Sequence, residues 1–253
     1  TATRYDGRCL DPTNGLTMTT ITDQISRNLD RVHDVISNAS SRSGRSADDV
    51  QLVCVTKYAR EEWIDALLKC GQTALGENRP QQLEQRADTY PDHVRWHLVG
   101  QLQRNKVRRT LGSTHLIHSV DNLRLLNRIE SIATDEGRHP SILLQVNLSE
   151  DDDRNGFTDA TLRACWDHVC DLDHTRILGL MTMAPVADDP ESSRPTFESL
   201  RNLADELGAI RVKQGGEPLS ELSMGMSNDY QVAIETGATM VRLGRTLFQG
   251  LDH

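Results

Sequence analysis

Leu52-Val53-Cys54-Val55-Thr56-Lys57-Tyr58 is the stretch that decides the fold. Its four consecutive apolar residues are typical of a strand covered on both faces, as in a parallel sheet. Side chains alternate along a strand, so Lys57 would share one face with Val53 and Val55. A buried apolar strand that runs straight into a lysine is the feature that the rest of the sequence has to explain.

Lys57 has two interpretations. It is either an ordinary residue of the loop beyond the strand, or an amine kept at the end of a buried strand because it reacts. An unpaired ammonium costs several kcal/mol to bury. The same burial lowers the pKa of a lysine and prepares it for Schiff-base chemistry.

The bulk composition narrows the class of protein. The 253 residues, 37% of them hydrophobic, suffice for one large domain or two small ones. No apolar run approaches the roughly 20 residues that span a bilayer, and a net charge of −9 argues against a nucleic-acid-binding protein. Five cysteines without C-x-x-C spacing indicate reduced thiols in a cytoplasmic protein rather than disulfides or a zinc site.

The N-terminal segment 1–17 is polar and lacks the apolar core of a signal peptide. We expect it to be a poorly ordered extension and expect 18–253 to form a single domain. Apolar residues then recur every three or four positions, as in Ile21, Ile25 and Leu29. This periodicity predicts an extra helix over 20–40, ahead of the first strand.

From Leu52 onward, short apolar runs alternate with segments of helical periodicity. After the first strand we predict strands over 73–78, 95–100, 116–120, 142–147, 177–183, 221–226 and 240–244. Between them we predict helices over 60–70, 80–88, 105–111, 122–136, 159–172, 195–207 and 230–236. Eight strands alternating with helices, without a Rossmann or P-loop glycine fingerprint, indicate an α/β fold with a single (β/α)8 TIM barrel. A doubly wound open sheet is the alternative.

The active sites of such barrels lie at the C-terminal ends of the strands. The predicted seventh loop, Met224-Gly225-Met226-Ser227-Asn228-Asp229, combines a glycine turn, a hydroxyl and a helix start, which is typical of an anion cradle. At the end of the last strand, Arg242 adds a cation and Gly244 permits close backbone approach. The alternative is that Ser227 or Asp229 only caps the following helix.

A strand-end lysine opposite a phosphate site suggests a phosphorylated aldehyde held as a Schiff base. Pyridoxal 5'-phosphate (PLP) fits this description. A sugar phosphate in an aldolase fits equally well, so the spacing of these residues leaves both open.

Six motifs occur in order along the chain: Val55-Thr56-Lys57, Gly76-Glu77-Asn78, 96–106, 179–183, 223–229 and Arg242-Leu243-Gly244. In these motifs the sequence resembles the pyridoxal phosphate homeostasis proteins, a family that looks like the N-terminal-domain barrel of alanine racemase standing alone. The resemblance runs from about residue 21 to residue 250.

The resemblance implies PLP as the cofactor, carried as a Schiff base on Lys57. It also implies that Asn78 lies near the ring and makes Ser223 the candidate for facing the pyridine nitrogen. No catalytic residue and no metal ligand is predicted. The phosphate is expected among Ser227, Arg242 and Gly244, and Gly225 completes the predicted cofactor-binding set.

Two features stand apart from the family pattern or from the site. Arg245 occupies a position where the family often has a small hydroxyl residue, and its side chain either adds charge at the phosphate or points to solvent. The basic run Arg104–Arg109 is either a solvated helix face or a docking patch for an anionic partner or a second phosphate. His97 is expected to be a core or pocket histidine, and an H-x-x-H metal site at His115 and His118 is not expected.

Two functions follow from the resemblance: a carrier that buffers or delivers PLP, with apo PLP-dependent enzymes as its partners, or a PLP-dependent amino-acid racemase-like enzyme. Racemisation needs an acid and a base on opposite faces of the substrate. In alanine racemase the tyrosine opposite the lysine comes from a domain after the barrel, whereas this chain ends at His253. Tyr58 is expected to leave the pocket on the opposite side. We therefore predict a monomeric carrier rather than an enzyme.

Overall fold

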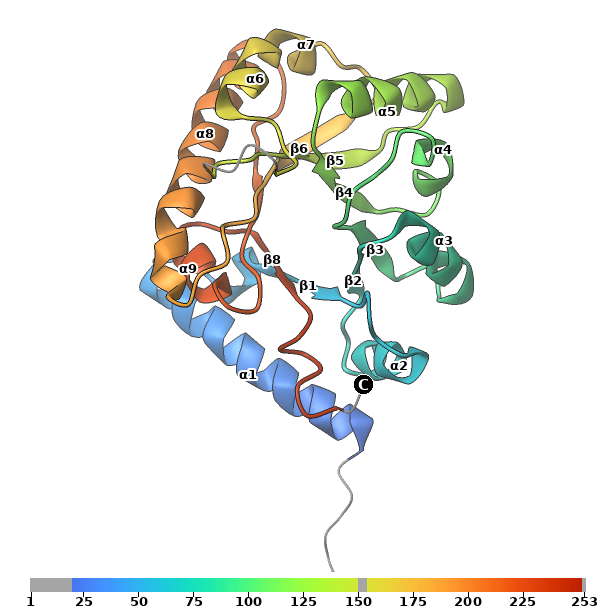
Figure 1. The fold of residues 1–253 in the computed structure, drawn as a ribbon, viewed down its shortest axis with the longest axis vertical. Helices are drawn as coiled ribbons and strands as arrows, with labels where there is room; N and C mark the ends of the chain where they lie inside the picture. Colours follow the sequence, from blue (N-terminus) through green and yellow to red (C-terminus); the bar gives the residue numbers. More distant parts are fainter. Residues whose placement is uncertain (1–19, 150–153, 252–253) are drawn as a thin grey trace, which may run out of the picture.

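Eight parallel strands close into a barrel in sequence order (Figure 1). The computed structural model describes residues 20–149 and 154–251, so the predicted extension 1–17 lies outside the described residues. The closed barrel confirms the (β/α)8 prediction, and the open-sheet alternative is wrong. The strands are β1 (Gln51–Val55), β2 (Ala74–Glu77), β3 (Arg95–Leu98), β4 (Leu116–Val120), β5 (Ser141–Gln145), β6 (Arg176–Met181), β7 (Glu221–Ser223) and β8 (Met240–Leu243).

Helices surround the barrel and cover the outer face of its strands (Figure 1). The predicted helix over 159–172 is wrong in one respect, because it is two helices separated at Cys165, whose φ of −109° and ψ of 10° leave the helical range. The helices are α1 (Ile21–Arg42), η1 (Ala47–Asp49), α2 (Glu61–Lys69), α3 (Pro80–Thr89), α4 (Val107–Thr110), α5 (Leu123–Glu136), α6 (Asp159–Ala164), α7 (Trp166–Cys170), η2 (Pro190–Ser193), α8 (Arg194–Lys213) and α9 (Tyr230–Glu235).

The strands are buried on both faces, which explains their continuous apolar character. All five residues of β4 are buried. A small apolar cluster fills the inside of the barrel, and a larger one joins the outer faces of the strands to the helices. The inner cluster consists of Leu116, Leu143, Met181 and Met240.

The predicted N-terminal helix is present as α1. Thr20 caps it, since its side chain accepts a hydrogen bond from the amide of Asp23. The Asn28 side chain donates to the carbonyls of Leu247 at 3.0 Å and Gln249 at 2.9 Å. Because α1 holds the end of the chain in this way, it fixes the segment that follows β8. No helix in the described ranges is both long and apolar enough to cross a membrane.

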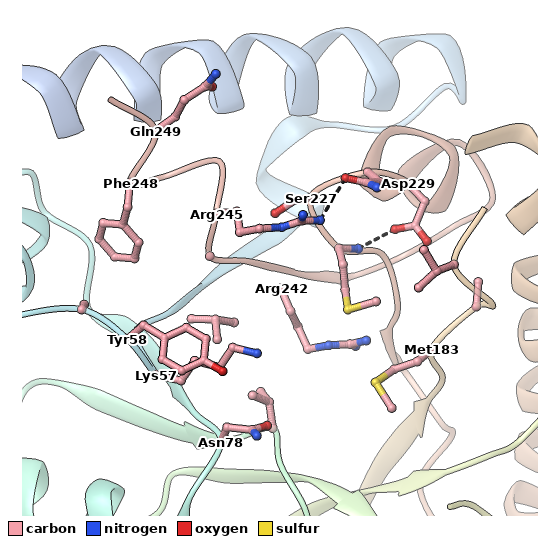
Figure 2. Close-up of a pocket in the computed structure, with 18 of the residues that line it drawn as sticks. Lys57, Tyr58, Asn78, Met183, Ser227, Asp229, Arg242, Arg245, Phe248 and Gln249 are labelled. Carbon is pink, nitrogen blue, oxygen red and sulfur yellow. Dashed lines mark hydrogen bonds between the residues drawn. The ribbon is translucent and has the colours of Figure 1, made fainter. Parts of the chain in front are cut away.

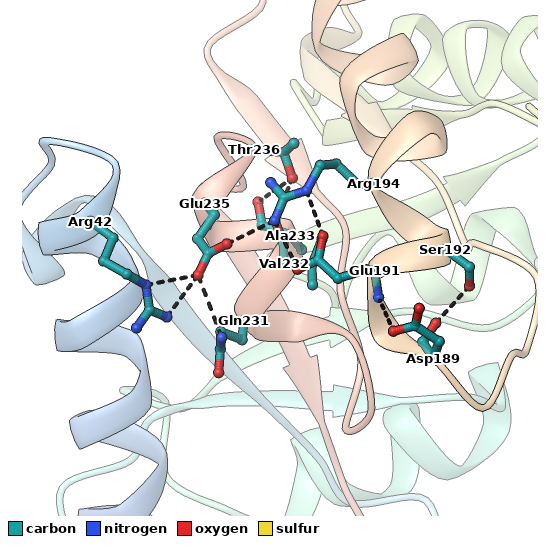
Figure 3. Close-up of polar contacts among 10 residues, drawn as sticks. All are labelled: Arg42, Asp189, Glu191, Ser192, Arg194, Gln231, Val232, Ala233, Glu235 and Thr236. Carbon is teal, nitrogen blue, oxygen red and sulfur yellow. Dashed lines mark hydrogen bonds and ion pairs between the residues drawn. The ribbon is translucent and has the colours of Figure 1, made fainter.

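An ion-pair network joins α1, α8 and α9 (Figure 3). Glu235 of α9 lies 2.7 Å from Nη2 of Arg42 and 2.9 Å from Nη2 of Arg194. Arg194 also pairs with Glu191 of η2 at 2.7 Å. The hydrogen bond from Arg194, together with the one from Arg42, lowers the pKa of Glu235 although partial burial opposes this.

Glu235→Gln is predicted to lower the free energy of unfolding by about 1–2 kcal/mol at pH 7, because the amide cannot pair with two guanidinium groups. The folded-state pKa of Glu235 lies below its unfolded value, so this contribution is complete above about pH 4.3. It is lost as the pH falls through the folded-state pKa. Urea unfolding at pH 7 and at lower pH measures the difference.

Glu198→Gln is the matched control for this prediction, because Glu198 is an exposed glutamate of α8 with no ion pair to a described residue. The prediction fails if both substitutions cost the same at pH 7, or if the loss in Glu235→Gln is unchanged at low pH.

Candidate functional site

A cavity of about 700 Å³ lies at the C-terminal ends of the strands (Figure 2). Its walls come mainly from the segments after β1, β2, β3, β6, β7 and β8. Two residues of the predicted set, Ser223 and Gly225, do not line it. The other five line it together: Lys57, Asn78, Ser227, Arg242 and Gly244.

Lys57 is an exposed residue two positions beyond the end of β1. Of the two interpretations of Lys57, its position matches a residue of the loop beyond the strand, since the strand stops at Val55 and the amine is not desolvated. Its Nζ lies 5.1 Å from the centroid of the Tyr58 ring, a cation–π distance. Tyr58 also lines the pocket, so the expectation that it leaves the pocket is wrong as well. Beyond a strand, side-chain alternation no longer decides which way a residue points.

A buried ion pair between Glu77 and Arg86 contacts the backbone of the loop that carries Lys57. Glu77 is fully buried, and its Oε1 accepts hydrogen bonds from Arg86 and from the Thr56 hydroxyl. The guanidinium of Arg86 also donates to the carbonyl of Thr56 at 2.9 Å and to that of Ala59 at 2.8 Å. These two carbonyls flank Lys57, so Arg86 fixes both ends of its loop. Burial raises the pKa of Glu77, against the opposing effect of Thr56 and Arg86.

The β7–α9 loop has the compact geometry that its sequence suggested. The backbone of Gly225 has a φ of +91°, and a Cβ there would lie 2.6 Å from the Cβ of Ala233. Asp229 folds the loop back, because its Oδ1 accepts from the amide of Met226 at 2.6 Å. Its Oδ2 accepts from the Ser193 hydroxyl at 3.3 Å. The Asp229 side chain does not cap α9, so the capping interpretation of this residue is wrong. The turn leaves Ser227 at the pocket wall.

Arg242 lies at the floor of the pocket and is only 5% exposed (Figure 2). Its Nη1 donates to Oγ of Ser223 at 2.5 Å, and its Nη2 donates to the carbonyl of Thr182 at 2.9 Å. Burial lowers the pKa of Arg242 to about 10. Ser223 is fully buried beneath the pocket, where its hydroxyl also contacts Nδ1 of His118 at 2.8 Å. Arg242, rather than Ser223, therefore presents its polar group to the cavity.

The charged side chains of the pocket wall favour an anionic ligand. Three are cationic, Lys57, Arg242 and Arg245, and one is acidic. The acid, Asp229, already accepts two hydrogen bonds from the protein. Arg245 lies in the pocket wall and donates from Nη2 to Oδ1 of Asn228 at 3.2 Å. Arg245 is exposed to solvent at the pocket wall, so its position shares features of both alternatives and adds positive charge to the mouth of the site.

The basic run outside the pocket is partly neutralised. Arg108 pairs with Asp135 and Glu136, and Arg109 pairs with Glu84. These pairs match a solvated helix face. Within the ranges that the structure describes, no cluster of three or more histidine, cysteine or acidic side chains could hold a metal ion.

The alanine racemase N-terminal domain model matches residues 27–252. The pyridoxal phosphate homeostasis protein of Aquifex aeolicus is 36% identical over 87% of this chain and 95% of its own length. That of Escherichia coli K12 is 31% identical over 90% of this chain and 97% of its own. The chain belongs to the pyridoxal phosphate homeostasis protein family. The resemblance found in its motifs is thereby confirmed.

Solved structures agree with membership of the pyridoxal phosphate homeostasis protein family. PipY of Synechococcus elongatus PCC7942, solved with PLP bound, superposes with a TM-score of 0.77 at 34% identity, over 88% of this chain and 99% of PipY. Alanine racemase of Clostridium difficile superposes with a TM-score of 0.67 at 16% identity, over 89% of this chain and 59% of the racemase. This more distant likeness shows a shared barrel fold and nothing further.

Arg86→Met is predicted to lower the free energy of unfolding by about 3–5 kcal/mol, because it leaves the Glu77 carboxylate buried without its cation. Glu77→Gln in the same chain should restore part of this loss, since a neutral amide costs less to bury. Urea unfolding followed by circular dichroism measures both. Arg79→Met, at an exposed arginine with no ion pair to a described residue, is the control. Equal losses of unfolding free energy at Arg86 and Arg79 would contradict a stabilising role of the buried Glu77–Arg86 ion pair.

Proposed function

We propose that this chain binds PLP in the pocket at the barrel mouth and serves PLP homeostasis by buffering or delivering the cofactor. In this proposal Lys57 holds PLP as a Schiff base. One observation carries it. The chain has four lysines, all within the described ranges, and Lys57 alone among them lines the pocket.

The donor set of the pocket fits PLP. Bound PLP supplies an aldehyde that condenses reversibly with an amine, on a ring that also bears a phosphate. The amine would be that of Lys57, and the Ser227 hydroxyl with the cationic Arg245 would hold the phosphate beside Gly244. Arg242 would supply further positive charge at the floor. Asn78 would lie near the ring. The cavity of about 700 Å³ is ample for one such molecule. PipY, whose structure contains PLP, supports the same ligand.

A carrier suits the exposure of the reacting residue. Lys57 is exposed to water, and Tyr58 comes from the same loop rather than from the opposite wall. Asp229 is already committed to the loop by two hydrogen bonds. An open site with one exposed amine favours exchange of the cofactor over proton transfer on two faces of a substrate. We therefore propose a carrier without enzymatic activity of its own. The four described cysteines are free, which suits a cytoplasmic protein, and we propose that it is a monomer.

The racemase-like alternative keeps one observation in its favour. Tyr58 lines the pocket, with the centroid of its ring 5.1 Å from Nζ of Lys57, and its side chain carries a hydroxyl that could exchange protons. Racemisation of amino acids by the purified protein, lost in both Lys57→Ala and Tyr58→Phe, would support the enzyme and contradict the carrier.

Lys57→Ala is predicted to abolish the visible absorption of PLP bound to the protein, because no other lysine reaches the pocket. Borohydride reduction of the wild-type protein, followed by peptide mapping, should label Lys57. The three remaining lysines supply matched controls: Lys69→Ala, Lys106→Ala and Lys213→Ala. A label on any of these three, or an unchanged spectrum in Lys57→Ala, would show that the covalent site is misplaced.

Delivery predicts that the PLP-loaded protein activates an apo-aminotransferase faster than its spontaneous release of PLP allows. The physical reason is that the exposed lysine can pass the cofactor on within a complex, without release to bulk water. Release is measured separately, with a scavenger that traps free PLP. Equal rates of activation and release would restrict the function to buffering.

A further inference from the structure

Four buried polar side chains from four strands form a chain of contacts across the inside of the barrel. His97 of β3 approaches His118 of β4, with 2.9 Å between its Nδ1 and Nε2 of His118. The Nδ1 of His118 lies 2.8 Å from the hydroxyl of Ser223 in β7. That hydroxyl lies 2.5 Å from Nη1 of Arg242 in β8. Both histidines and the serine are fully buried, so water does not reach the part of this chain of contacts that lies beneath Arg242.

The direction of each hydrogen bond follows from what these groups can donate. Arg242 can only donate, so the oxygen of Ser223 accepts from it. The Ser223 hydrogen then has one acceptor among the described residues, Nδ1 of His118. His118 must in that case carry its hydrogen on Nε2 and donate it to Nδ1 of His97. One buried group is left over, Nε2 of His97, which has no partner among the described residues.

The reverse order is less favourable. If His118 donated from Nδ1, the Ser223 hydroxyl would have no acceptor for its hydrogen, and Nε2 of His97 would still lack a partner. Burial lowers the pKa of His97 to about 3 and lowers that of His118 well below its usual value, so both rings are neutral near pH 7. A neutral His118 with a bare Nδ1 is therefore the state that satisfies the most groups.

This arrangement holds Arg242 through neutral hydrogen-bond acceptors rather than through a paired carboxylate. The acceptors of its two terminal nitrogens, the Ser223 hydroxyl and the Thr182 carbonyl, are both neutral. No carboxylate of the described residues forms an ion pair with Arg242, although the charge of Asp229 acts on it and opposes the effect of burial on its pKa. Neutral acceptors fix the guanidinium at the pocket floor, and since no carboxylate is hydrogen-bonded to it, its positive charge remains available to a ligand.

We propose that His118 is a positioning residue that acts through Ser223 to hold Arg242 against the ligand. His118 accepts the Ser223 hydrogen and so turns the lone pairs of the hydroxyl toward the guanidinium. The ligand presents a hydrogen-bond acceptor to the guanidinium, a ring nitrogen or a phosphate oxygen; on the proposed function it is PLP, so this inference rests on that function. His118 itself does not line the pocket.

Substitutions at His118 test the proposal, because they can remove the hydrogen-bond acceptor while keeping a ring, or keep an acceptor without the ring. His118→Phe keeps the ring volume and removes the acceptor, and it is expected to raise the PLP dissociation constant about tenfold. Ser223→Ala is expected to do the same, and the double variant should be no weaker than either single one, because both break one connection. His118→Asn is expected to restore binding, since its amide oxygen can accept in place of Nδ1.

Leu116→Ala is the matched control, because Leu116 lies inside the barrel on the same strand but belongs to its apolar cluster. It should lower stability while leaving the position of the PLP absorption band unchanged. His118→Phe should shift the band in the same direction as Arg242→Met. Equal bands and equal affinities in His118→Phe and Leu116→Ala would overturn the proposal.

A measurement without cofactor keeps the test independent of the proposed function. The ¹⁵N chemical shifts of the His118 imidazole should report a neutral ring protonated on Nε2 in the wild-type protein. A ring protonated on Nδ1, or a charged ring, would overturn the proposal. Failure of the wild-type protein to bind PLP would instead contradict the proposed function. The tautomer of His118 could still be measured in that case, because the measurement needs no cofactor.

Discussion

Pairing between the first and the last strand is the interaction on which the pocket depends. β1 and β8 pair in parallel with Val53 opposite Arg242, so the two strands end side by side. The loop of Lys57 therefore starts beside Gly244. A Cβ at Gly244 would lie 3.1 Å from the carbonyl of Val55, so glycine suits this close approach. Closing the barrel thus makes the wall with Lys57 and the wall with Arg242 and Gly244 neighbours, although about 190 residues of chain separate them.

Two buried charges at this end of the barrel are handled in different ways. Glu77 has its own cation, Arg86, and the pair serves to hold the loop of Lys57. Arg242 donates to neutral acceptors only, and Asp229 acts on its charge without forming an ion pair. A desolvated ion pair gives little net stability but fixes geometry, whereas a desolvated single charge costs stability until an anion arrives. The first arrangement suits a brace, and the second suits a binding site.

The barrel could be predicted because its determinants are local: apolar runs of strand length alternate with helical periodicity, and β4 lies where its sequence placed it. Because active sites of such barrels lie at the C-terminal ends of the strands, the sequence also predicted that Lys57, Ser227 and Arg242 share one pocket. What could not be predicted depends on contacts between distant residues. Arg86 reaches a carboxylate in another element, and Ser223 meets a histidine 105 positions away. No periodicity encodes such pairs, so Ser223 was expected at the ligand when it lies beneath Arg242.

Retaining a cofactor and releasing it require different environments, one buried and one open to water. The pocket offers both, at Arg242 and at Lys57. In the proposed function Arg242 contributes to retention of the ligand, because its charge is buried, held by hydrogen bonds and screened little by water. The covalent contact in the proposed function is made by Lys57, which stands exposed at the mouth where water and another amine can reach it. Because the bond to an amine is reversible, its exposure sets how readily the cofactor leaves, while the buried charge sets how strongly it is retained. An enzyme would need the reverse, a reacting centre closed to water, and this separation is the structural argument for a carrier.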